Sequence, residues 1–428
     1  MAGALAGIRV ADFSQAWAGP FAARILAAMG AQVIKVEGPG RMDGWRGGMG
    51  VENPVRYPGT EGGARPWNRS CLFNTQNLNK VAVALDLKQK EGTELARRLA
   101  ASSHLVINNF RPKVMDRLGL GYEELRTLRP DIICVDMPAF GNSGPRSHFI
   151  GWGPNFEAAA GQCAILGYED DPTPVSTNYA FLDPTGGIHG AAAALTALFH
   201  WKRTGEGQYV EVSQHEAALP MVGEYLLDWA ANQRLAVRQG NLHPWAAPHG
   251  NFRCAGDDQW VAIHVRSDSE WQSLCRVLQR EDLAEDPRWN QIHVRHRHQG
   301  ELRPQIEAWT RQREKHAAAR ELRAGGVMAG PVNDATDLLR DAHLRSRGFF
   351  QRLTHPEAGT HDYSGLPLLL SETPAEITDP APCFGEHNRE VLMGILGLSE
   401  AEYASLAAQG VIADEPSDNR RDMYSARS

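Results

Sequence analysis

Short apolar runs alternate with amphipathic stretches along the first half of the chain. Runs rich in Val, Ile and Leu predict buried strands at 8–13, 32–37, 81–85, 105–107 and 132–135. Apolar residues at helical spacing predict helices at 21–29, 92–102 and 122–127. Apolar strands that alternate with helices indicate a mostly parallel sheet covered on both faces. The pattern therefore predicts an α/β fold.

The pattern changes near Gln239-Gly240. Ahead of that point we expect a helix from Asp183 to about residue 204, a strand at 209–213 and a long helix at 214–231. Beyond it we expect a hairpin, charged helices to about residue 324 and a closing helix, with the hairpin strands at 250–254 and 260–264 and the last helix near 388–396.

A chain of 428 residues is too long for one compact core. We expect a large domain built from residues 1–225 and 326–413. A smaller α+β domain is expected at 226–325, inserted between the two parts. The polar tail at 414–428 is expected to be poorly ordered.

Composition excludes several classes of partner. The formal net charge of -7 argues against a nucleic-acid binder, which would carry a basic stripe. No segment combines membrane-spanning length with an absence of charge, and the N-terminus lacks the pattern of a signal peptide. Six scattered cysteines without a CxxC pair predict neither disulfides nor structural zinc. We expect a cytoplasmic protein with no nucleic-acid, membrane or metal partner.

Asp183 opens the run Asp183-Pro184-Thr185-Gly186-Gly187, directly ahead of an alanine-rich helical stretch. An Asp followed by Pro is typical of a helix N-cap with Pro at the first helical position. A carboxylate in this place could also act as a nucleophile. The two interpretations are compatible, because backbone N–H groups at a helix start favour the ionised carboxylate.

Familiar motifs are missing elsewhere. The strand-helix-strand start ends in Glu37, which invites a dinucleotide site, but the required G-x-G-x-x-G is absent between strand and helix. A Walker A loop, an H-E-x-x-H helix and a G-x-S-x-G elbow are absent too. The histidines at 293–298 are interleaved with arginines, so a solvated helical face is favoured over a metal site.

Several segments read together resemble the class III CoA-transferase family. The matching segments are 5–10 with Ala18-Gly19-Pro20, 30–37, Asn77-Leu78-Asn79-Lys80 with 85–88, Asn109-Phe110-Arg111-Pro112 with Arg117-Leu118-Gly119, the turn at 204–208, and Gly385-Glu386-His387-Asn388. They stand in the family's order over roughly residues 5 to 400. The resemblance implies a Rossmann-like large domain, a smaller inserted domain and two interlocked subunits. It also implies no tightly bound cofactor, with a coenzyme A thioester as substrate.

By this resemblance the catalytic residue is Asp183. Its carboxylate would attack a donor acyl-CoA, giving a mixed aspartyl anhydride and then an aspartyl-CoA thioester that the acceptor acid attacks. Gly186 and Gly187 could leave backbone N–H groups free to stabilise an oxyanion there. The residues carried over for binding coenzyme A are Ala18, Leu85, Lys88, Asn109, Phe110, Arg111 and Arg117.

At several positions this chain departs from the family pattern, and these departures argue against some of the activities found in the family. Racemases of the family carry a histidine where Trp152 stands, which argues against α-proton exchange. The glutamine of formyl-CoA transferase is replaced by Trp17, and no glycine-rich run lies between residues 239 and 259. A basic residue after Glu37 is replaced by Gly38, for which Arg41 could compensate.

Three aromatic residues, Trp17, Phe140 and Trp152, could line an acyl pocket. Such a pocket favours transfer from an acyl-CoA donor to a bulky or aromatic carboxylic acid, such as a benzylsuccinate-like acceptor. Core packing is the alternative role for each aromatic. Two other functions stay open, racemisation or isomerisation of an acyl-CoA, and a non-catalytic subunit of a hetero-oligomer. A homodimer is expected, and a hetero-oligomer is possible within the family.

Overall fold

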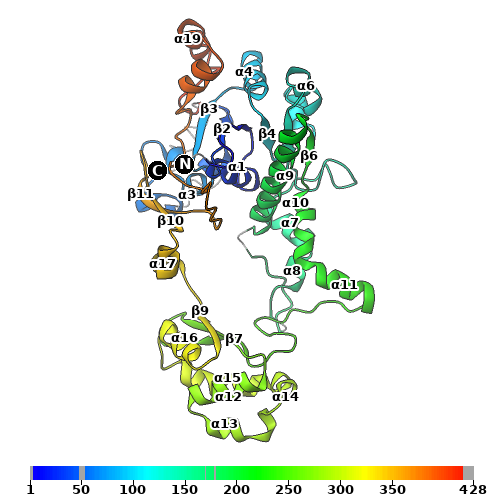
Figure 1. The fold of residues 1–428 in the computed structure, drawn as a ribbon, viewed down its shortest axis with the longest axis vertical. Coiled ribbons are helices and arrows are strands. Elements are labelled where there is room, and N and C mark those ends of the chain that lie inside the picture. Colours follow the sequence, from blue (N-terminus) through cyan, green and yellow to red (C-terminus); the bar gives the residue numbers. More distant parts are fainter. Residues whose placement is uncertain (1–2, 48–53, 169, 178–179, 418–428) are drawn as a thin grey trace. The chain divides into compact units, whose positions relative to one another are not determined.

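The computed structural model describes residues 3–47, 54–168, 170–177 and 180–417. The chain divides into two compact units, each made of segments distant in sequence (Figure 1). The larger unit comprises Met1–Gln162, Ser176–Gln233 and His343–Ser428, and the smaller comprises Cys163–Val175 and Arg234–Ala342. The smaller unit therefore includes the segment 163–175, which lies ahead of the expected insertion.

A six-stranded parallel sheet forms the centre of the larger unit. Its order is β3-β2-β1-β4-β5-β6, the arrangement of doubly wound nucleotide-binding folds. The strands are β1 (Arg9–Asp12), β2 (Gln32–Glu37), β3 (Lys80–Ala84), β4 (Leu105–Asn108), β5 (Ile133–Asp136) and β6 (Tyr209–Glu211). The predicted mixed α/β fold with a parallel sheet is confirmed.

Alternate residues of each strand enter two different cores. In β1, Val10 packs with α1 (Ala18–Ala28) and α9 (Leu182–Thr204), whereas Ala11 packs on the opposite face. That face is covered by α4 (Lys90–Ala101), α5 (Val114–Arg117), α6 (Tyr122–Leu128) and α19 (Glu400–Ala408). Both faces are apolar because strands buried on two sides have no solvent face to leave polar.

Asp183 is not the helix N-cap that the sequence predicts. Helix α9 begins at Leu182, Phe181 occupies the cap position, and Asp183 lies in the first turn. Leu182 is 1% exposed in an apolar cluster with Phe156 and Ala218, so its burial draws it into the helix. The Asp183 carboxylate therefore projects from the first turn instead of closing the helix end.

Two further helix expectations differ from the structure. The predicted helix at 214–231 is broken into α10 (Gln214–Ala218), a 3-10 turn at Leu219–Val222 and α11 (Gly223–Asn232). Pro220 lacks an N–H group and so cannot continue an α-helix ladder. The helix expected at 388–396 is a π-helix at Glu390–Ile395, and it does not close the fold, because α19 (Glu400–Ala408) follows it.

An ionic network is buried beneath the ends of β1 and β2. Lys80 Nζ lies 2.8 Å from Asp12 Oδ2, and Lys35 Nζ lies 2.9 Å from Asp43 Oδ2. The Arg46 guanidinium reaches Glu37 Oε2 at 2.9 Å and stacks on the Phe73 ring. Glu37 is thus paired inside the protein, which leaves it unsuited to binding a ribose.

The smaller unit is an antiparallel sheet covered by helices. Strands β7 (His249–Arg253), β8 (Trp260–His264) and β9 (Met328–Pro331) form the sheet, and the helices are α12 (Asp268–Leu278), α13 (Glu281–Glu285), α14 (Ile292–Arg297), α15 (Gln299–Thr310) and α16 (Lys315–Ala324). The predicted hairpin is confirmed. Helix α14 is only partly the solvated face expected, because Arg295 is fully buried against Trp271.

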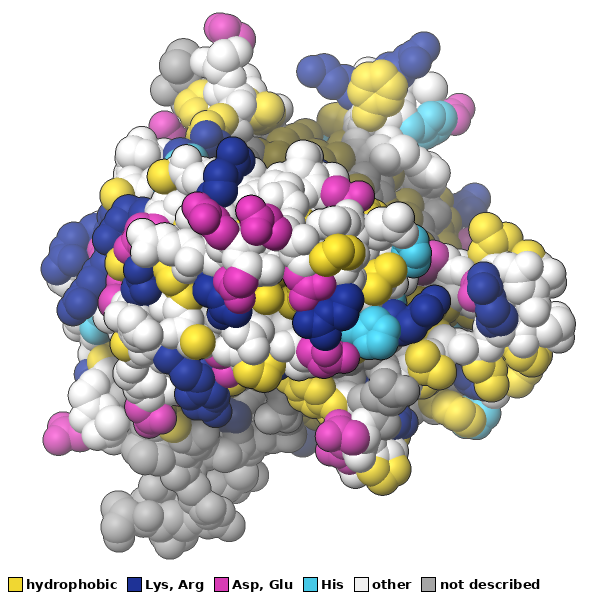
Figure 2. Space-filling view, turned by 90° about the horizontal axis from the view of Figure 1, so that it is seen from below, with side chains coloured by type: hydrophobic (Ala, Val, Ile, Leu, Met, Phe, Trp, Pro, Cys, Tyr) yellow, Lys and Arg dark blue, Asp and Glu magenta, His cyan; other side chains and the backbone are white. Residues whose placement is uncertain are grey.

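The surface drawn in Figure 2 mixes basic and acidic side chains without a continuous basic stripe. Within the described residues, no helix is both long and apolar enough to cross a membrane. The same residues contain no group of three or more His, Cys, Asp or Glu that could hold a metal ion. The six cysteines all belong to the described residues, and none of them forms a disulfide bond. The last part of the expected polar tail, residues 418–428, lies outside the described residues.

Candidate active site

A cavity of about 1310 Å³ opens along the carboxyl ends of the parallel strands. Its walls come from the segments that follow β1, β2, β3, β4 and β5, from α3 (Cys71–Gln76), from the start of α7 (Gly153–Ala159) and from Asp183. Open α/β sheets bind ligands at this edge, where the strand order reverses. The strand order of this sheet reverses between β1 and β4.

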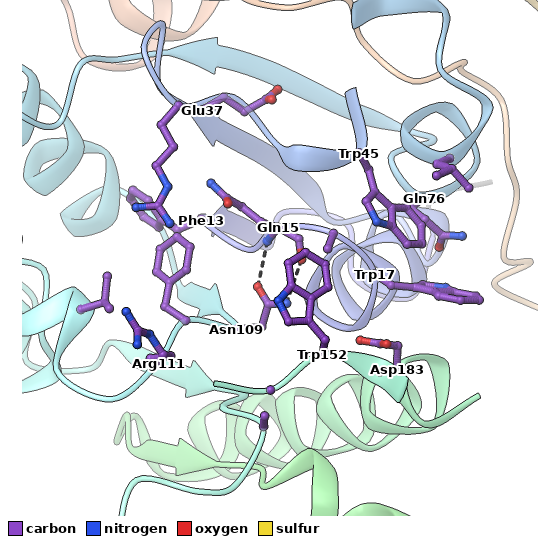
Figure 3. Close-up of a pocket in the computed structure, with 18 of the residues that line it drawn as sticks. Phe13, Gln15, Trp17, Glu37, Trp45, Gln76, Asn109, Arg111, Trp152 and Asp183 are labelled. Carbon is purple, nitrogen blue, oxygen red and sulfur yellow. Dashed lines mark hydrogen bonds between the residues drawn. The ribbon is translucent and has the colours of Figure 1, made fainter. Parts of the chain in front are cut away.

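Asp183 lines this cavity from the first turn of α9 (Figure 3). Its side chain is half-buried and accepts no hydrogen bond from any residue that the structure describes. Burial without a compensating partner raises the pKa of Asp183 to about 7. The carboxylate is therefore poorly solvated and reactive once ionised.

Gly153 leaves room for the Asp183 carboxylate. A Cβ atom on Gly153 would lie 2.4 Å from Asp183 Oδ2 and 2.0 Å from Ala180 Cβ. A Cβ atom on Gly151 would lie 1.9 Å from Ala139 Cβ. Any side chain at these positions would push the loop or the carboxylate out of place, so both positions require glycine.

We expect Gly153→Ala to lower kcat by about 100-fold, because a displacement on the order of 1 Å at the reacting group costs about that factor. Steady-state kinetics would measure it, with Gly300→Ala on α15 as the matched control, since a Cβ there meets no atom within 4 Å. An unchanged kcat would contradict the close fit.

The raised pKa of Asp183 predicts a pH-dependent rate. Below about pH 7 the free enzyme carries a protonated carboxyl, which is not nucleophilic. We expect kcat/KM for the acyl-CoA to rise about tenfold per pH unit up to about pH 7 and then to level. A pH profile measures this, and a flat profile from pH 5 to 8 would be inconsistent with the burial of Asp183.

Glu157 fixes the chain that leads to Asp183. Its buried carboxylate accepts hydrogen bonds from Thr177 Oγ1 at 2.6 Å, from Thr177 N at 3.3 Å and from Ser176 Oγ at 3.2 Å. Glu157 lies on α7, whose first residue is Gly153. Helix α7 therefore lies against Asp183 through Gly153 and also anchors Ser176 and Thr177 through Glu157.

Two tryptophans stand together on the wall of the cavity. The rings of Trp17 and Trp45 have centroids 5.2 Å apart, and both rings line the cavity. Asp43 Oδ1 accepts from Trp45 N at 2.9 Å and from Ala16 N at 3.1 Å, so one carboxylate fixes both loops. Figure 3 shows Trp17, Trp152 and Asp183 on the same side of the pocket, with Arg111 on the other.

Four cations line the cavity without an ion-pair partner among the described residues: Arg41, Lys88, Arg111 and Arg117. All four are exposed. Arg41 occupies the place expected to compensate for the missing basic residue at Gly38. Asn109 and Phe110 line the same cavity, and Asn109 is held by reciprocal 2.8 Å hydrogen bonds with the Gln15 backbone.

The structure brings eight of the predicted site residues to this cavity: Trp17, Lys88, Asn109, Phe110, Arg111, Arg117, Trp152 and Asp183. Ala18 and Leu85 are fully buried in the two sheet cores instead. Phe140 packs against the rings of Phe149 and His215. These three residues support the walls without lining the cavity.

Gly186 and Gly187 do not present free N–H groups, because they lie inside the ladder of α9. A Cβ atom on Gly187 would lie 2.8 Å from Ala18 O, and one on Gly186 would lie 2.9 Å from Gln214 Cγ. Their role here is close packing of α9 against α1 and α10.

Sequence reasoning did not single out three residues that line the cavity: Trp45, Gln76 and Gln214. Gln76 and Gln214 are 7% and 4% exposed, and the Oε1 atom of each is buried without a hydrogen-bond partner. The sequence offered one sign that Gln76 belongs to the site, because Gln76 directly precedes the family segment Asn77-Leu78-Asn79-Lys80. No comparable signal marks Gln214.

A sequence model of CoA-transferase family III matches residues 5–388. The chain belongs to CoA-transferase family III. Succinyl-CoA–D-citramalate CoA-transferase of Chloroflexus aurantiacus is 32% identical over 405 residues, covering 95% of this chain and 97% of that one. Formyl-CoA:oxalate CoA-transferase of Streptomyces avermitilis is 31% identical over 432 residues, covering 96% and 100%. The family expectation from the sequence is confirmed.

A solved structure of a CAIB/BAIF family protein from Brucella suis has the same fold. It superposes with a TM-score of 0.84 at 26% sequence identity and covers 92% of this chain and 100% of that one. This member of CoA-transferase family III is therefore an enzyme that transfers coenzyme A, and its cavity is the candidate place for that transfer.

Proposed function

We propose that this enzyme transfers coenzyme A from an acyl-CoA thioester to a carboxylic acid, with Asp183 as the nucleophile. The observation that carries the proposal is the poorly solvated Asp183 carboxylate, which accepts no hydrogen bond from the described residues. It lines one cavity together with a tryptophan wall and with four cations that have no ion-pair partner in the same part of the chain. The cations suit the phosphates of coenzyme A, and the aromatic wall suits an acyl group.

Each step exchanges one acyl bond for another. Asp183 Oδ attacks the thioester carbonyl, and the C–S bond breaks to give a mixed anhydride and CoA thiolate. The thiolate attacks the aspartyl carbonyl, releasing the donor acid and leaving an aspartyl-CoA thioester. The acceptor carboxylate attacks the carbonyl of this aspartyl thioester, and its C–S bond breaks to give a second mixed anhydride and CoA thiolate. The thiolate then attacks the acceptor carbonyl of the anhydride, which forms the product thioester and releases the Asp183 carboxylate. The intermediates are similar to the substrates in reactivity, so the free-energy change of each step is small.

Coenzyme A would lie with its phosphates toward Arg41, Lys88, Arg111 and Arg117. Guanidinium groups bind phosphate oxygens with two parallel hydrogen bonds, and lysine binds as a point charge. Phe110 offers a flat apolar surface between them. The thioester would then reach the side of the pocket where Asp183 and the tryptophans lie (Figure 3).

The acceptor is a bulky or aromatic acid, as a benzylsuccinate-like molecule would be. Trp17, Trp45 and Trp152 support this part of the proposal because all three line the cavity. The relatives are named for acids with two carboxylates, D-citramalate and oxalate, and a further one for glutarate. A benzyl-substituted dicarboxylate combines the two features.

Racemisation is the second candidate and has less support. The cavity residues that the structure describes include no histidine. Trp152 lines the cavity at the position where racemases of the family carry a histidine. Exchange of an α-proton between two faces needs a second acid-base group. Uptake of deuterium at the α-carbon without an acceptor acid would favour this alternative.

The experiment that tests the proposal is a panel of carboxylic acids offered with succinyl-CoA and with acetyl-CoA, read by mass spectrometry of the product thioesters. A parallel incubation with donor acyl-CoA and hydroxylamine should shift the mass of the peptide that contains Asp183. Transfer with no shift on that peptide would overturn the role of Asp183, and no new thioester would overturn the reaction.

We expect the enzyme to act as a homodimer. Helix α11 has no buried residue, and it exposes Tyr225, Leu226, Leu227 and Trp229. Exposed apolar surface of this extent marks an interaction site. One relative is named as the alpha subunit of a succinyl-CoA–L-malate CoA-transferase, so activity of the purified chain alone distinguishes a homodimer from a mixed assembly.

A further inference from the structure

The Gln214 side chain presents a buried, unbonded acceptor in the wall of the cavity. Gln214 is 4% exposed and lines the cavity. Its Oε1 atom has no hydrogen-bond partner among the residues that the structure describes. A buried acceptor that stays without a donor destabilises the state in which it occurs. Because this acceptor lines a substrate cavity, we expect its donor to arrive with the ligand.

Hydrogen bonds to two neighbouring carbonyl groups fix Gln214 and the orientation of its amide. Gln214 Nε2 donates to Met137 O at 2.7 Å, and Gln214 N donates to Pro138 O at 3.2 Å. The bond to Met137 O needs the nitrogen of the amide, so it determines which end of the amide is nitrogen and which is oxygen. The end that is left for a ligand is Oε1, which can only accept a hydrogen bond.

This acceptor lies against the face of α9 that carries Asp183. A Cβ atom added to Gly186 would lie 3.3 Å from Gln214 Oε1 and 2.9 Å from Gln214 Cγ. Gly186 follows Asp183 by three residues in α9, and side chains at that spacing are neighbours on one helix face, about 5–6 Å apart. Gln214 Oε1 and the Asp183 carboxylate therefore line the same part of the cavity.

Only one of the two substrates of the proposed reaction carries a suitable donor in a fixed place. The ionised carboxylate of an acceptor acid has acceptor oxygens only. The pantetheine arm of an acyl-CoA carries amide N–H groups, and two methylene groups separate the nearest one from the sulfur. Figure 3 shows Asp183 and Arg111 on opposite sides of the pocket, so an acyl-CoA with its phosphates at the cations extends this arm toward Asp183.

We propose that Gln214 Oε1 accepts a hydrogen bond from the amide N–H group nearest the thioester sulfur of the acyl-CoA. The inference rests on the proposed function and adds a binding residue to it. The bond fixes the thioester relative to Asp183, on which the rate of attack depends. An acyl-CoA without that N–H group leaves the buried acceptor unbonded, so the enzyme discriminates against it.

Gln76 is another glutamine of the cavity whose Oε1 atom is buried without a partner in the described part of the chain. It comes from α3, whereas Gln214 comes from α10 and packs against α9. No hydrogen bond to a described residue fixes the orientation of the Gln76 amide, so either of its ends can face a ligand. Gln76→Met therefore tests whether the contact is assigned to the correct glutamine.

The test compares succinyl-CoA with its analogue in which an ester oxygen replaces the amide N–H group nearest the sulfur. The replacement removes the donor and keeps the length of the arm. With the best acceptor of the acid panel, we expect the native enzyme to prefer the amide by about 10- to 100-fold in kcat/KM, the range for leaving one buried group unbonded. Gln214→Met should reduce this preference to about threefold or less, whereas Gln76→Met should keep it.

The ratio of the two kcat/KM values separates binding from a structural role. Gln214→Met also leaves Met137 O without its donor, and such a disturbance lowers kcat/KM for the amide and the ester by the same factor. Only a lost contact to the N–H group changes their ratio. Gln162→Met is the matched control, because Gln162 Oε1 is buried and unbonded within the described residues but Gln162 does not line the cavity. This control should leave the ratio unchanged.

Three results would overturn the proposal. Equal kcat/KM for both substrates in the native enzyme would show that Gln214 Oε1 meets water alone. An unchanged preference in Gln214→Met would show that another group accepts from the N–H, and a preference lost in Gln76→Met would assign the contact to Gln76.

A binding measurement distinguishes failure of this contact from failure of the proposed function. Free coenzyme A and its ester analogue, titrated calorimetrically into the native protein and into Gln214→Met, should show the same preference in Kd and the same loss. That result without CoA transfer to any acid would support the contact and refute the transferase proposal. CoA transfer without a preference in either Kd or kcat/KM would support the transferase and refute the contact.

Discussion

Asp183→Asn is expected to lower CoA transfer by at least about 10³-fold, because loss of a covalent nucleophile is among the costliest single changes in an enzyme. The side chain keeps its size in a half-buried position, so the fold should persist. Transfer would be followed by mass spectrometry of the product thioester. Transfer at the native rate in Asp183→Asn would refute the nucleophile.

The same substitution should stabilise the protein at alkaline pH. The pKa of Asp183 is raised to about 7 in the folded state, against about 4 for an unperturbed Asp. Between those values the unfolded chain ionises while the folded state stays protonated, so native stability falls as pH rises toward 7 and is level above it. The Asp183→Asn variant has no ionisable group at this position, so it does not lose this stability as the pH rises.

Each pKa unit corresponds to about 1.4 kcal/mol. Because Asp183 is only half-buried, solvent screening reduces the full effect, and we expect Asp183→Asn to be more stable by about 1–2 kcal/mol at pH 8. Urea unfolding at pH 5 and pH 8 measures it. A stability difference that does not grow with pH would show that the pKa of Asp183 is not raised in the folded protein.

The sheet followed from the sequence because its strands are buried on both faces. Such strands are continuous apolar runs, as at 105–107 and 132–135, and the structure has β4 and β5 there. Asp183 was predicted as a site residue because the matching segments stand in the order of CoA-transferase family III. In the structure Asp183 lines the cavity at the strand ends.

The details of the site depended on contacts that no local pattern encodes. Asp183 has the local pattern of an N-cap, but burial of Leu182 draws that residue into the helix, so the cap lies two residues earlier, at Phe181. Gln76 has the pattern of an ordinary polar residue in a short helix, and only the three-dimensional arrangement shows that its Oε1 atom is buried at the cavity with no hydrogen-bond partner among the described residues. Gly186 and Gly187 read as open turn glycines, and tight helix packing gives them another role.

Asp43→Leu is expected to destabilise the protein by about 3–5 kcal/mol, the cost of leaving a buried charge without its partner. Lys35 and Asp43 have fully buried side chains, and the Lys35 ammonium also donates to Ser14 O. Burial lowers the pKa of Lys35, but the carboxylates of Asp43, Asp12 and Glu37 outweigh it and raise the pKa overall. Asp43→Leu removes the largest of these raising contributions and leaves the buried Lys35 ammonium without its ion-pair partner.

The double variant Lys35→Met/Asp43→Leu separates the charge from the hydrogen bonds. Removing both charges should recover at least half of the lost stability in urea unfolding, because two apolar side chains can fill the same space. Both variants should have reduced CoA-transfer activity. In each of them Ala16 N and Trp45 N lack the Asp43 Oδ1 acceptor that fixes Trp17 and Trp45 against each other. If the double variant is no more stable than Asp43→Leu, the ion pair is not what stabilises this region. If it regains full activity, the tryptophan wall does not depend on Asp43.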